Sequence, residues 1–369
     1  MLFIQSKKNA LLTLACCLLG LTTATASPAS KLIKRMKALQ QTGIMVGHQD
    51  APMYGHHWKW DEGRSDIKDI IGDYPAVMGF ELGALELGHD KNIDQVPFDR
   101  MRLEIRRQHE RGGIVELSWH PYNPVTGKNA WDPEGRPVKE ILPGGSQHSK
   151  FNDWLHAVAL FLGSLRTADG KLIPVIFRPW HEMGGGWFWW GSNSCTPSEY
   201  KQLYTYTHRM LTKKYRLNNL VWGYSPNGGD EDFLRWYPGD KYVDLMGVDI
   251  YDFEADNDKY RANIARELSR LQQIGRQHRK LIALTETGAQ QLPDSTWFTQ
   301  VFWPAVKDYP ISYVLFWRNA WDNHKETYMA YPGGPMEQDF RTFAGYGRTL
   351  FVNDINAKKD RNQNNTNIQ

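Results

Sequence analysis

The feature that most restricts the fold of this chain is a regular alternation of short apolar runs with longer amphipathic stretches. It begins near Lys31 and continues through most of the 369 residues. Each run is rich in Val, Ile, Leu and aromatic residues and is too short for a typical helix, which favours a buried strand. Eight such runs are present, over residues 44–50, 75–83, 112–120, 172–182, 219–227, 243–252, 281–288 and 311–319.

The stretches between these runs carry apolar residues at three- and four-residue spacing, which indicates helices. The clearest cover residues 98–111, 151–166, 197–215, 260–279 and 295–307. Strands that are apolar on both faces and alternate with helices form parallel sheets, and eight units suit a closed (β/α)8 TIM barrel in a single α/β domain. A doubly wound open sheet is the alternative, but the segment GHQDAPMYG after the first run is not the glycine-rich phosphate turn that this fold needs.

Polar and aromatic residues gather at the end of each apolar run. In a (β/α)8 barrel the catalytic groups lie at the carboxyl ends of the strands, so the pattern predicts one site at the barrel mouth. Any single residue of the set also suits a turn or a helix cap, and the recurrence at every run is what favours a site. The residues are His48, Gln49, Asp50, Glu81, Trp119, His120, His181, Glu182, Ser225, Asn227, Asp249, Tyr251, Glu286, Trp317 and Arg318.

The fourth run ends in the most distinctive stretch, FRPWHEMGGGWFWWG, over residues 177–191. It sets Arg178, His181 and Glu182 at the end of a strand and follows them with three glycines and four consecutive aromatic residues. Aromatic faces stack on sugars, and apolar surroundings raise the pKa of a Glu carboxyl until it can donate a proton. The alternative is a buried Glu followed by a surface loop, which fits less well because four aromatic residues in a Gly-rich loop make a poor core.

A second carboxylate in apolar surroundings, Glu286, ends the seventh run in the sequence LTETG. Hydrolysis of a glycosidic bond with retention of configuration needs two carboxyl groups about 5 Å apart, and the fourth and seventh strands face each other across a barrel mouth. We expect Glu182, beside His181 and the aromatic residues, to stay protonated as the acid. We expect Glu286, within reach of Arg178 and Tyr251, to be the ionised nucleophile.

With RPWHEMGGGWFWWG, SWHP, VDIY, LTETG and FWRN in this order, residues 31–353 resemble glycoside hydrolase family 26, a barrel family best known for β-1,4-mannanases. The resemblance implies that Glu182 is the acid/base and Glu286 the nucleophile. It implies that substrate is contacted by His120, Arg178, His181, Trp187, Asp249, Tyr251, Trp317 and Arg318. The family also contains β-1,3-xylanases and mixed-linkage β-glucanases, which are therefore alternatives. Met183 stands where the family usually has Asn or a small polar residue.

The first 26 residues have the pattern of a secretory signal peptide. Lys7 and Lys8 precede an apolar run over residues 10–21, and the small residues 24–26 predict cleavage before Ser27. The run is too short for a permanent membrane span, so we expect export to the periplasm or the extracellular space. Two cysteines inside the run raise a lipoprotein alternative. Residues 27–355 are then the catalytic domain, and the polar residues 356–369 are expected to be a disordered tail.

Composition agrees with a protein that binds sugars. The chain has 15 Trp and 17 Tyr, more than a core alone needs, although a Trp-rich core is the alternative. The net charge of +3 predicts neither nucleic-acid nor membrane-surface binding. Without the signal only Cys195 is left, so no disulfide forms, and the scattered histidines without a His-Glu-x-x-His spacing argue against a metal hydrolase. We expect a monomer that acts on β-mannan without cofactor or metal.

Three further expectations concern the rim of the site. His56 and His57, beside two tryptophans, predict either a binding rim or a solvated turn. The long segments 82–95 and 122–147 follow neighbouring strands, and they either wall off one end of the cleft, so that mannobiose is released, or leave it open for internal cutting. A sugar-binding barrel without catalytic activity is the non-enzymatic alternative, and it would not need both Glu182 and Glu286.

Overall fold

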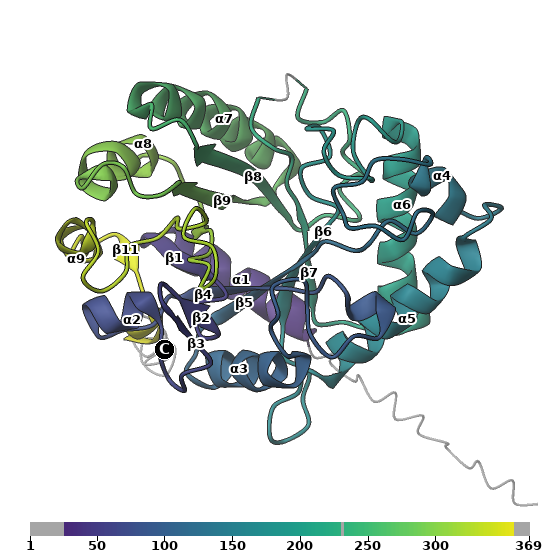
Figure 1. Cartoon of the computed structure of the whole chain (residues 1–369), viewed down its shortest axis with the longest axis horizontal. Helices are drawn as coiled ribbons and strands as arrows, with labels where there is room; N and C mark the ends of the chain where they lie inside the picture. The colour runs from purple at the N-terminus through teal and green to yellow at the C-terminus, as the bar shows by residue number, and fades with distance from the viewer. Residues whose placement is uncertain (1–25, 230–231, 358–369) are drawn as a thin grey trace, which may run out of the picture.

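All eight predicted strands are present and form a closed barrel in the computed structural model, which describes residues 26–229 and 232–357 (Figure 1). They are β1 (Ile44–Gln49), β4 (Val77–Glu81), β5 (Ile114–Trp119), β6 (Val175–Pro179), β7 (Leu220–Tyr224), β8 (Leu245–Asp252), β9 (Leu281–Ala289) and β10 (Tyr313–Phe316). Neighbouring strands are parallel, and β1 pairs with β10 from Met45–Tyr313 to His48–Phe316, which closes the sheet. The fold is a (β/α)8 TIM barrel, and the open-sheet alternative is excluded.

Helices surround this barrel on the outside, as Figure 1 shows. They are α1 (Pro28–Gln40), α2 (Asp66–Ile71), α3 (Phe98–Glu110), α4 (Pro137–Ile141), α5 (His148–Ser164), α6 (Pro197–Arg209), α7 (Asn257–His278), α8 (Trp303–Val306) and α9 (Glu337–Ala344), with helical turns at Leu85–Leu87, Met210–Lys214 and Trp297–Phe302. Each predicted helix is present. Helix α7 begins earlier than predicted because the Asp256 side chain accepts a hydrogen bond from the Lys259 amide and caps it.

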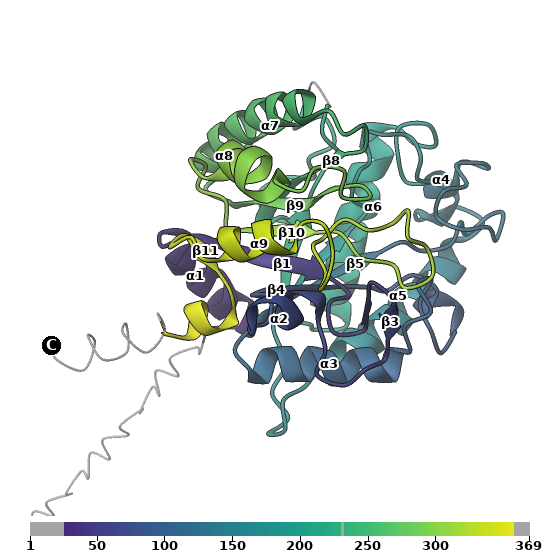
Figure 2. The same cartoon turned by 60° about the vertical axis from the view of Figure 1, so that its left-hand side comes forward.

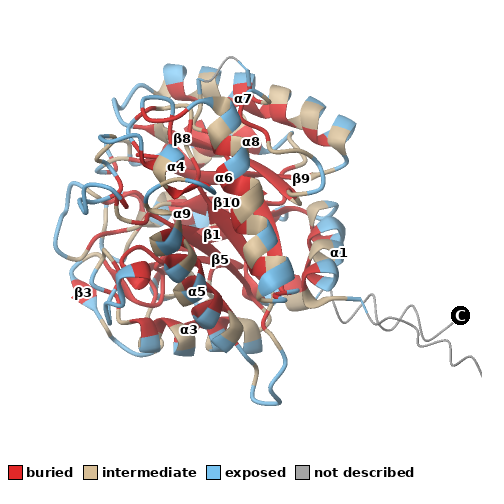
Figure 3. Ribbon diagram, turned by 90° about the vertical axis from the view of Figure 1, so that its right-hand side faces the viewer, coloured by how far each residue is buried: buried red, intermediate tan, exposed pale blue. Residues whose placement is uncertain are grey.

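Helix α1 closes the amino-terminal end of the barrel. Its apolar face, which includes Leu32 and Met36, is buried against side chains from the starts of the strands, such as Met45, Ile114 and Leu281. Figure 2 shows α1 at this end, beside β1 and β11, and Figure 3 shows the strands as the buried centre of the molecule. Because one end is filled by apolar packing, polar groups that the strands carry at their other end are left for a site.

Three short strands lie outside the main barrel order. Strands β2 (Tyr54–Gly55) and β3 (Trp58–Lys59) pair as an antiparallel hairpin directly after β1, and β11 (Thr349–Leu350) pairs with the start of β1. The hairpin carries His56 and His57 in its turn. It therefore rises at the carboxyl end of the barrel, beside the loop that follows β10.

The predicted terminal segments fall largely outside the described residues. This holds for residues 1–25 of the predicted signal peptide and for residues 358–369 of the predicted tail. At the start of that tail, Asn356 is held by a hydrogen bond from its side-chain amide to the Arg111 carbonyl at 2.7 Å. Among the helices of the described part of the chain, none combines the length and the apolar character needed to cross a membrane.

Candidate active site

Glu182 lies just beyond β6, in a backbone turn at the barrel mouth. Strand β6 ends at Pro179, and Trp180 and Glu182 then adopt positive φ angles of 58° and 53°. Such angles are costly for residues other than glycine and occur where the surrounding structure enforces them, often in active sites. Here the Glu182 amide donates to the Ser225 carbonyl, just after β7, at 2.8 Å. The end of the neighbouring strand therefore helps to hold the turn that presents Glu182.

Glu182 is half-buried, and its carboxyl has Trp187 as its direct partner. The indole Nε1 donates to Glu182 Oε2 at 2.8 Å. Desolvation of the carboxyl and, after it, the negative charge of Glu286 together raise the pKa of Glu182 to about 8, and the Trp187 hydrogen bond opposes this rise only in part. Glu182 is therefore mostly protonated at neutral pH, as a general acid must be.

Glu286 is positioned by an irregularity in β9. The pairing of β9 with β8 shifts between Val248 and Asp249, and its pairing with β10 shifts between Val314 and Phe316. The extra β9 residue in both cases lies between Leu284 and Thr287, next to Glu286. A bulge of this kind re-aims a side chain at a barrel rim. It brings Asp249 of β8 directly opposite Glu286.

The Glu286 carboxylate accepts hydrogen bonds on both oxygens. Arg178 donates from Nη2 to Oε1, and the Tyr251 hydroxyl donates to Oε2 at 2.6 Å. His181 Nε2 lies 3.8 Å from Oε1. Burial lowers the pKa of His181 well below its usual value, and the charges of Arg178 and His120 lower it further, so this imidazole is neutral. Both donors to Glu286 come from strands, which favours a fixed orientation of this carboxylate.

Arg178 is a buried cation beneath the site. Its side chain has no exposed surface, and it contacts Glu116 at 2.6 Å and Asp249 at 3.1 Å in addition to Glu286. Although burial alone would lower the pKa of Arg178, the surrounding carboxylates, Asp249 first, raise it well above the usual value. A permanent positive charge thus lies among three carboxylates and offsets the cost of burying them.

The distance between the two predicted catalytic carboxyls matches one stereochemical class. Ligating oxygens of Glu182, Asp249 and Glu286 all lie within 4.8 Å of one another. In retaining glycosidases the two carboxyl groups are about 5–5.5 Å apart, whereas inverting enzymes keep them about 6.5–9.5 Å apart to admit a water molecule. The separation of Glu182 and Glu286 therefore supports attack by a carboxylate rather than by water.

A cavity of about 640 Å³ opens above these carboxyls. Eight of the ten predicted site residues line it: His120, His181, Glu182, Trp187, Asp249, Tyr251, Glu286 and Trp317. His120 is fixed by Glu81, which lies 2.7 Å from its Nδ1. Burial opposes a charge on His120, but Glu81 outweighs burial and raises its pKa. The structure thus gathers residues from the ends of six of the predicted runs around one space.

Two predicted contact residues do not line this cavity. Arg178 points into the interior, where its three carboxylate partners hold it. Arg318 lines a neighbouring hollow instead, where it forms ion pairs with Asp94 and Glu326. It also donates a hydrogen bond from Nη1 to the Tyr54 hydroxyl at 3.2 Å. In both cases the nearest carboxylates determine the direction of the guanidinium group, and all of them except Glu326 are distant in the sequence.

The row of aromatic residues at 187–190 has a different role from the one that the sequence suggested. Only Trp187 is exposed, whereas Phe188, Trp189 and Trp190 are buried. Trp190 Nε1 donates to the His181 carbonyl and Trp189 Nε1 to the Pro121 carbonyl, both at 2.8 Å. The expectation that these aromatics make a poor core was therefore wrong for most of them. Their N–H groups find buried acceptors, and the packed rings support the backbone next to Glu182.

Sequence reasoning missed several residues of the cavity wall. Trp131, half exposed at 50%, stacks on His120 with the ring centres 5.4 Å apart and the planes at 10°. Phe253 and Tyr328 also face the cavity. Asn227 was expected at the barrel mouth as the end of a run, and the residues of the lining that were not predicted as contacts are Trp131, Phe188, Gly228, Gly229, Ile250, Phe253, Asn263, Arg266 and Tyr328. Exposed aromatics in long loops were the available signal, but their approach to the barrel mouth depends on loop conformation.

Glu182, Asp249 and Glu286 form one of two groups in the described residues whose spacing would admit a metal ion. Two of the three carboxylates in this group, Asp249 and Glu286, already contact the Arg178 guanidinium. A second cation in the same place would meet a fixed positive charge. The arrangement is thus suited to acid–base and nucleophilic chemistry without a metal.

Together, the barrel and its mouth define a class: a (β/α)8 protein with the carboxyl pair of a retaining glycoside hydrolase. The sequence matches glycosyl hydrolase family 26 over residues 22–329. It is similar to a family 26 β-mannanase of known structure from Bacteroides ovatus, with 42% identity, a TM-score of 0.86, and coverage of 89% of this chain and 95% of that one. The chain belongs to glycosyl hydrolase family 26.

Two further relatives are named mannan endo-1,4-β-mannosidases. A mannan endo-1,4-β-mannosidase of Bifidobacterium adolescentis is 33% identical over 322 residues, which are 80% of this chain and 32% of that protein. A mannan endo-1,4-β-mannosidase of Bacillus subtilis is 31% identical over 268 residues, which are 69% of each chain. The chain thus spans about a third of the first relative and about two thirds of the second.

Proposed function

We propose that this protein is a retaining glycoside hydrolase that cleaves β-1,4-mannosidic bonds in mannan and mannooligosaccharides. The observation that carries the proposal is the pair of carboxyls at the barrel mouth. Glu182, with its pKa raised to about 8, lies within 4.8 Å of Glu286, which accepts hydrogen bonds from Arg178 and Tyr251. The names of the Bacteroides, Bifidobacterium and Bacillus relatives support mannan as the substrate.

The reaction proceeds in two steps. First, Glu286 attacks the anomeric carbon while Glu182 gives its proton to the glycosidic oxygen, so the leaving sugar departs as an alcohol and a glycosyl ester forms on Glu286. This ester removes the negative charge that helps to raise the pKa of Glu182. The pKa of Glu182 therefore falls, so the carboxylate left after proton donation stays ionised. It takes a proton from a water molecule as that water attacks the anomeric carbon, which releases the sugar from Glu286 with a second inversion.

The remaining residues of the cavity hold the sugar or the catalytic carboxyls. Trp187 and Trp317 offer rings for stacking at the cavity wall, and His120 offers a polar group to sugar hydroxyls. The Asp249 side chain has no exposed surface and instead holds Arg178. Arg178 is a positioning residue, since it has no exposed surface and acts through Glu286. We assign Arg318 to the neighbouring hollow, where it holds the loop residue Asp94.

Internal cutting is the mode of action that we propose. The long loops 82–95 and 122–147 line a second hollow, and Trp131 belongs both to it and to the catalytic cavity. Two adjoining hollows have room for several successive sugar units, which supports an open cleft rather than a blocked one. Chain-end release of mannobiose would require these loops to close the cleft.

The products formed from unbranched β-1,4-mannan test both parts of the proposal. We expect a ladder of oligosaccharides and a fast loss of viscosity early in the reaction. Near-pure mannobiose with slow viscosity loss would contradict internal cutting and would show that the enzyme releases mannobiose from chain ends. Comparable rates on mannan, β-1,3-xylan and lichenan would contradict mannan specificity, and a preference for lichenan would favour a mixed-linkage glucanase.

We also propose export through the amino-terminal segment. Lys7 and Lys8 before the apolar residues 10–21, with small residues at 24–26, support cleavage before Ser27. Fractionation of cells that express the full chain, with amino-terminal sequencing of the product, tests this. A cytoplasmic product that retains residue 1 would contradict it, and a lipid-modified Cys would favour the lipoprotein alternative.

A further inference from the structure

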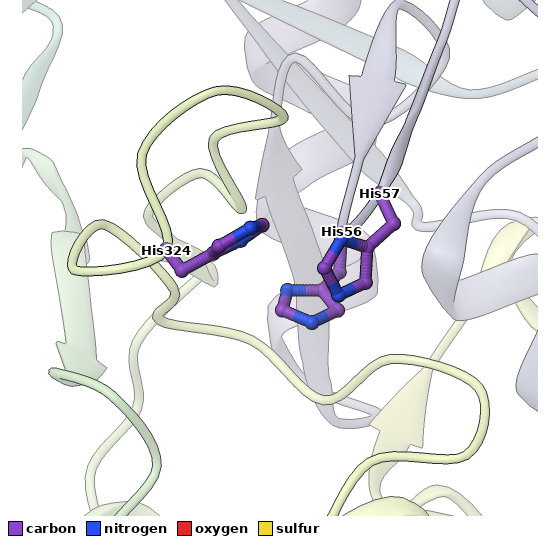
Figure 4. Close-up of side chains that lie close together, drawn as sticks. All are labelled: His56, His57 and His324. Atoms are coloured by element: carbon purple, nitrogen blue, oxygen red, sulfur yellow. The ribbon is translucent and has the colours of Figure 1, made fainter.

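Three histidines from two distant parts of the chain meet at the rim of the barrel. His56 and His57 form the turn of the β2–β3 hairpin, and His324 belongs to the loop that follows β10. Figure 4 shows the three imidazoles turned toward one another across the gap between these segments. Ligating nitrogens of all three rings lie within 4.8 Å of one another. None of the three belongs to the lining of the catalytic cavity, so the proposed hydrolysis does not use them.

The two segments that carry these histidines are tied to one buried carboxylate. Asp66 accepts hydrogen bonds from the His56 amide at 3.0 Å and from Trp58 Nε1 at 2.6 Å, which fixes the hairpin. It also accepts one from the side-chain amide of Asn319, at the base of the loop after β10, at 2.8 Å. The hairpin and the loop therefore share an anchor, and the gap between His57 and His324 is set by buried hydrogen bonds.

The loop that carries His324 is closed on itself. At its base, the Asn319 side-chain oxygen accepts hydrogen bonds from the amides of Tyr328 and Met329 at 3.0 and 2.9 Å. Farther along, the Thr327 hydroxyl donates to the His324 carbonyl at 3.1 Å. A loop held at both points presents its side chains in few orientations, which lowers the entropic cost of binding a ligand.

The imidazoles themselves are free to act as ligands. His56 stacks on Tyr331 with the ring centres 3.6 Å apart, and its Nδ1 is buried without a hydrogen-bond partner. A neutral imidazole carries a lone pair on one of its two nitrogens, and this lone pair can bind a metal ion. A buried polar atom without a partner, in a group of three imidazoles, indicates that a ligand is accommodated here.

We propose that His56, His57 and His324 bind one divalent transition-metal ion, with Zn²⁺ as the natural occupant. Three imidazole ligands suit Zn²⁺, Cu²⁺ and Ni²⁺, whereas Ca²⁺ and Mg²⁺ require oxygen ligands that these side chains do not offer. At Zn–N distances of about 2.0–2.1 Å, two ligands of a tetrahedral site lie about 3.3 Å apart. The imidazoles must then approach one another by at most about 1.5 Å, which side-chain rotation at an exposed rim allows.

Such an ion would join the β2–β3 hairpin to the loop after β10 in addition to the Asp66 anchor. Three protein ligands leave the fourth position to water, and His57 and His324 are exposed, so an ion can enter from solvent. Because the folded protein presents the ligands together and the unfolded chain does not, the bound ion stabilises the fold. This role is separate from the proposed hydrolysis, whose carboxyls surround Arg178 instead.

The test uses the mature protein, purified without a polyhistidine tag and stripped with a chelator. Calorimetric titration with Zn²⁺ is expected to give one ion per chain and a higher Tm. His324→Ala and His57→Asn are each expected to weaken binding at least tenfold and to abolish the rise in Tm. Asn is chosen at position 57 because it tolerates the positive φ of 64° found there. His156→Ala, which removes an exposed histidine of α5, is the matched control and is expected to bind as the parent does.

A second probe identifies the ligands directly. Cu²⁺ bound to the stripped protein is expected to show hyperfine coupling to several imidazole nitrogens in its electron paramagnetic resonance spectrum, and His324→Ala is expected to reduce their number. Circular dichroism and mannan hydrolysis confirm that each variant is folded. Failure of the parent to bind Zn²⁺ would overturn the proposal. Binding that both variants leave unchanged would also overturn it, and inhibition of hydrolysis in that case would assign the ion to the catalytic carboxyls.

Discussion

Arg178 reaches Glu286 from beneath the active site, with no exposed surface of its own, and donates a hydrogen bond from Nη2 to Oε1. The cation that faces the proposed nucleophile is thus part of the barrel interior and not of the substrate cleft. Its two other partners, Glu116 on β5 and Asp249 on β8, connect opposite parts of the barrel to the same group. We therefore expect both stability and the proposed hydrolysis to depend on this one side chain.

Replacement of Arg178 by Met is expected to lower both properties together. The change leaves Glu116, Asp249 and Glu286 buried without their cation, and loss of one partner of a buried ion pair costs about 3–5 kcal/mol. Urea unfolding, followed by fluorescence, measures the free energy of unfolding. Arg276→Ala, at an exposed position of α7, is the control and should change it by no more than about 0.5 kcal/mol. A stable Arg178→Met protein with full activity would contradict the assigned role.

The two catalytic carboxyls are expected to fail in different ways. Glu182→Ala and Glu286→Ala should each lower hydrolysis of mannan by about a thousandfold or more, because each removes a group that acts in the transition state. On an activated aryl mannoside, which needs no acid, Glu182→Ala should still form the glycosyl ester, and azide should restore turnover. Glu286→Ala should not respond to azide in this way. If azide rescued both variants alike or neither of them, the two roles assigned here would be contradicted.

The pH dependence of kcat/KM reports the pKa of Glu182 in the free enzyme. Since Glu182 must be protonated to act as the acid, activity is expected to fall as the pH rises through about 8. The Trp187 hydrogen bond lowers this pKa, so Trp187→Phe, which keeps an aromatic ring but removes the donor, should move the falling limb to higher pH. A limb that stays in place or moves to lower pH would show that Trp187 does not tune Glu182.

Tyr251 offers a sharper test of how Glu286 is oriented. Tyr251→Phe removes only the hydroxyl that donates to Glu286 Oε2 at 2.6 Å and retains the ring. We expect a fall in kcat by roughly ten- to a hundredfold, from loss of about 1.5–3 kcal/mol for a hydrogen bond to a charged group. Tyr328→Phe, whose hydroxyl accepts from Gln290 instead, serves as the comparison. Equal effects of the two changes would argue against a specific role of Tyr251.

Trp131 is expected to contribute to binding of the polymer and little to stability. Its half-exposed ring stacks on His120 and borders both hollows of the cleft. Trp131→Ala should raise KM for mannan several-fold, in line with about 1 kcal/mol for a lost aromatic contact, with little change in Tm. Leu160→Ala, at an exposed apolar residue of α5, should alter neither quantity. An unchanged KM in the Trp131 variant would remove this residue from the binding surface.

Much of the scaffold could be predicted from the sequence because it depends on local patterns. The eight apolar runs each became a barrel strand, and the polar residues at their ends came together because parallel strands of a closed barrel all end at the same rim. Glu182 and Glu286 were recognisable for the same reason. Their mutual distance within 4.8 Å follows from the barrel geometry rather than from any property of the two residues.

Other features were decided only by the tertiary structure. The burial of Trp189 and Trp190 and the inward direction of Arg178 depend on acceptors and carboxylates contributed by other strands and loops. The bulge that aims Glu286 arises from the pairing of β9 with both of its neighbours. The meeting of His56, His57 and His324 requires closure of the barrel between β1 and β10. Periodicity along a chain encodes which face of an element is buried, whereas the partner of a particular side chain is determined by long-range packing, which a local pattern does not contain.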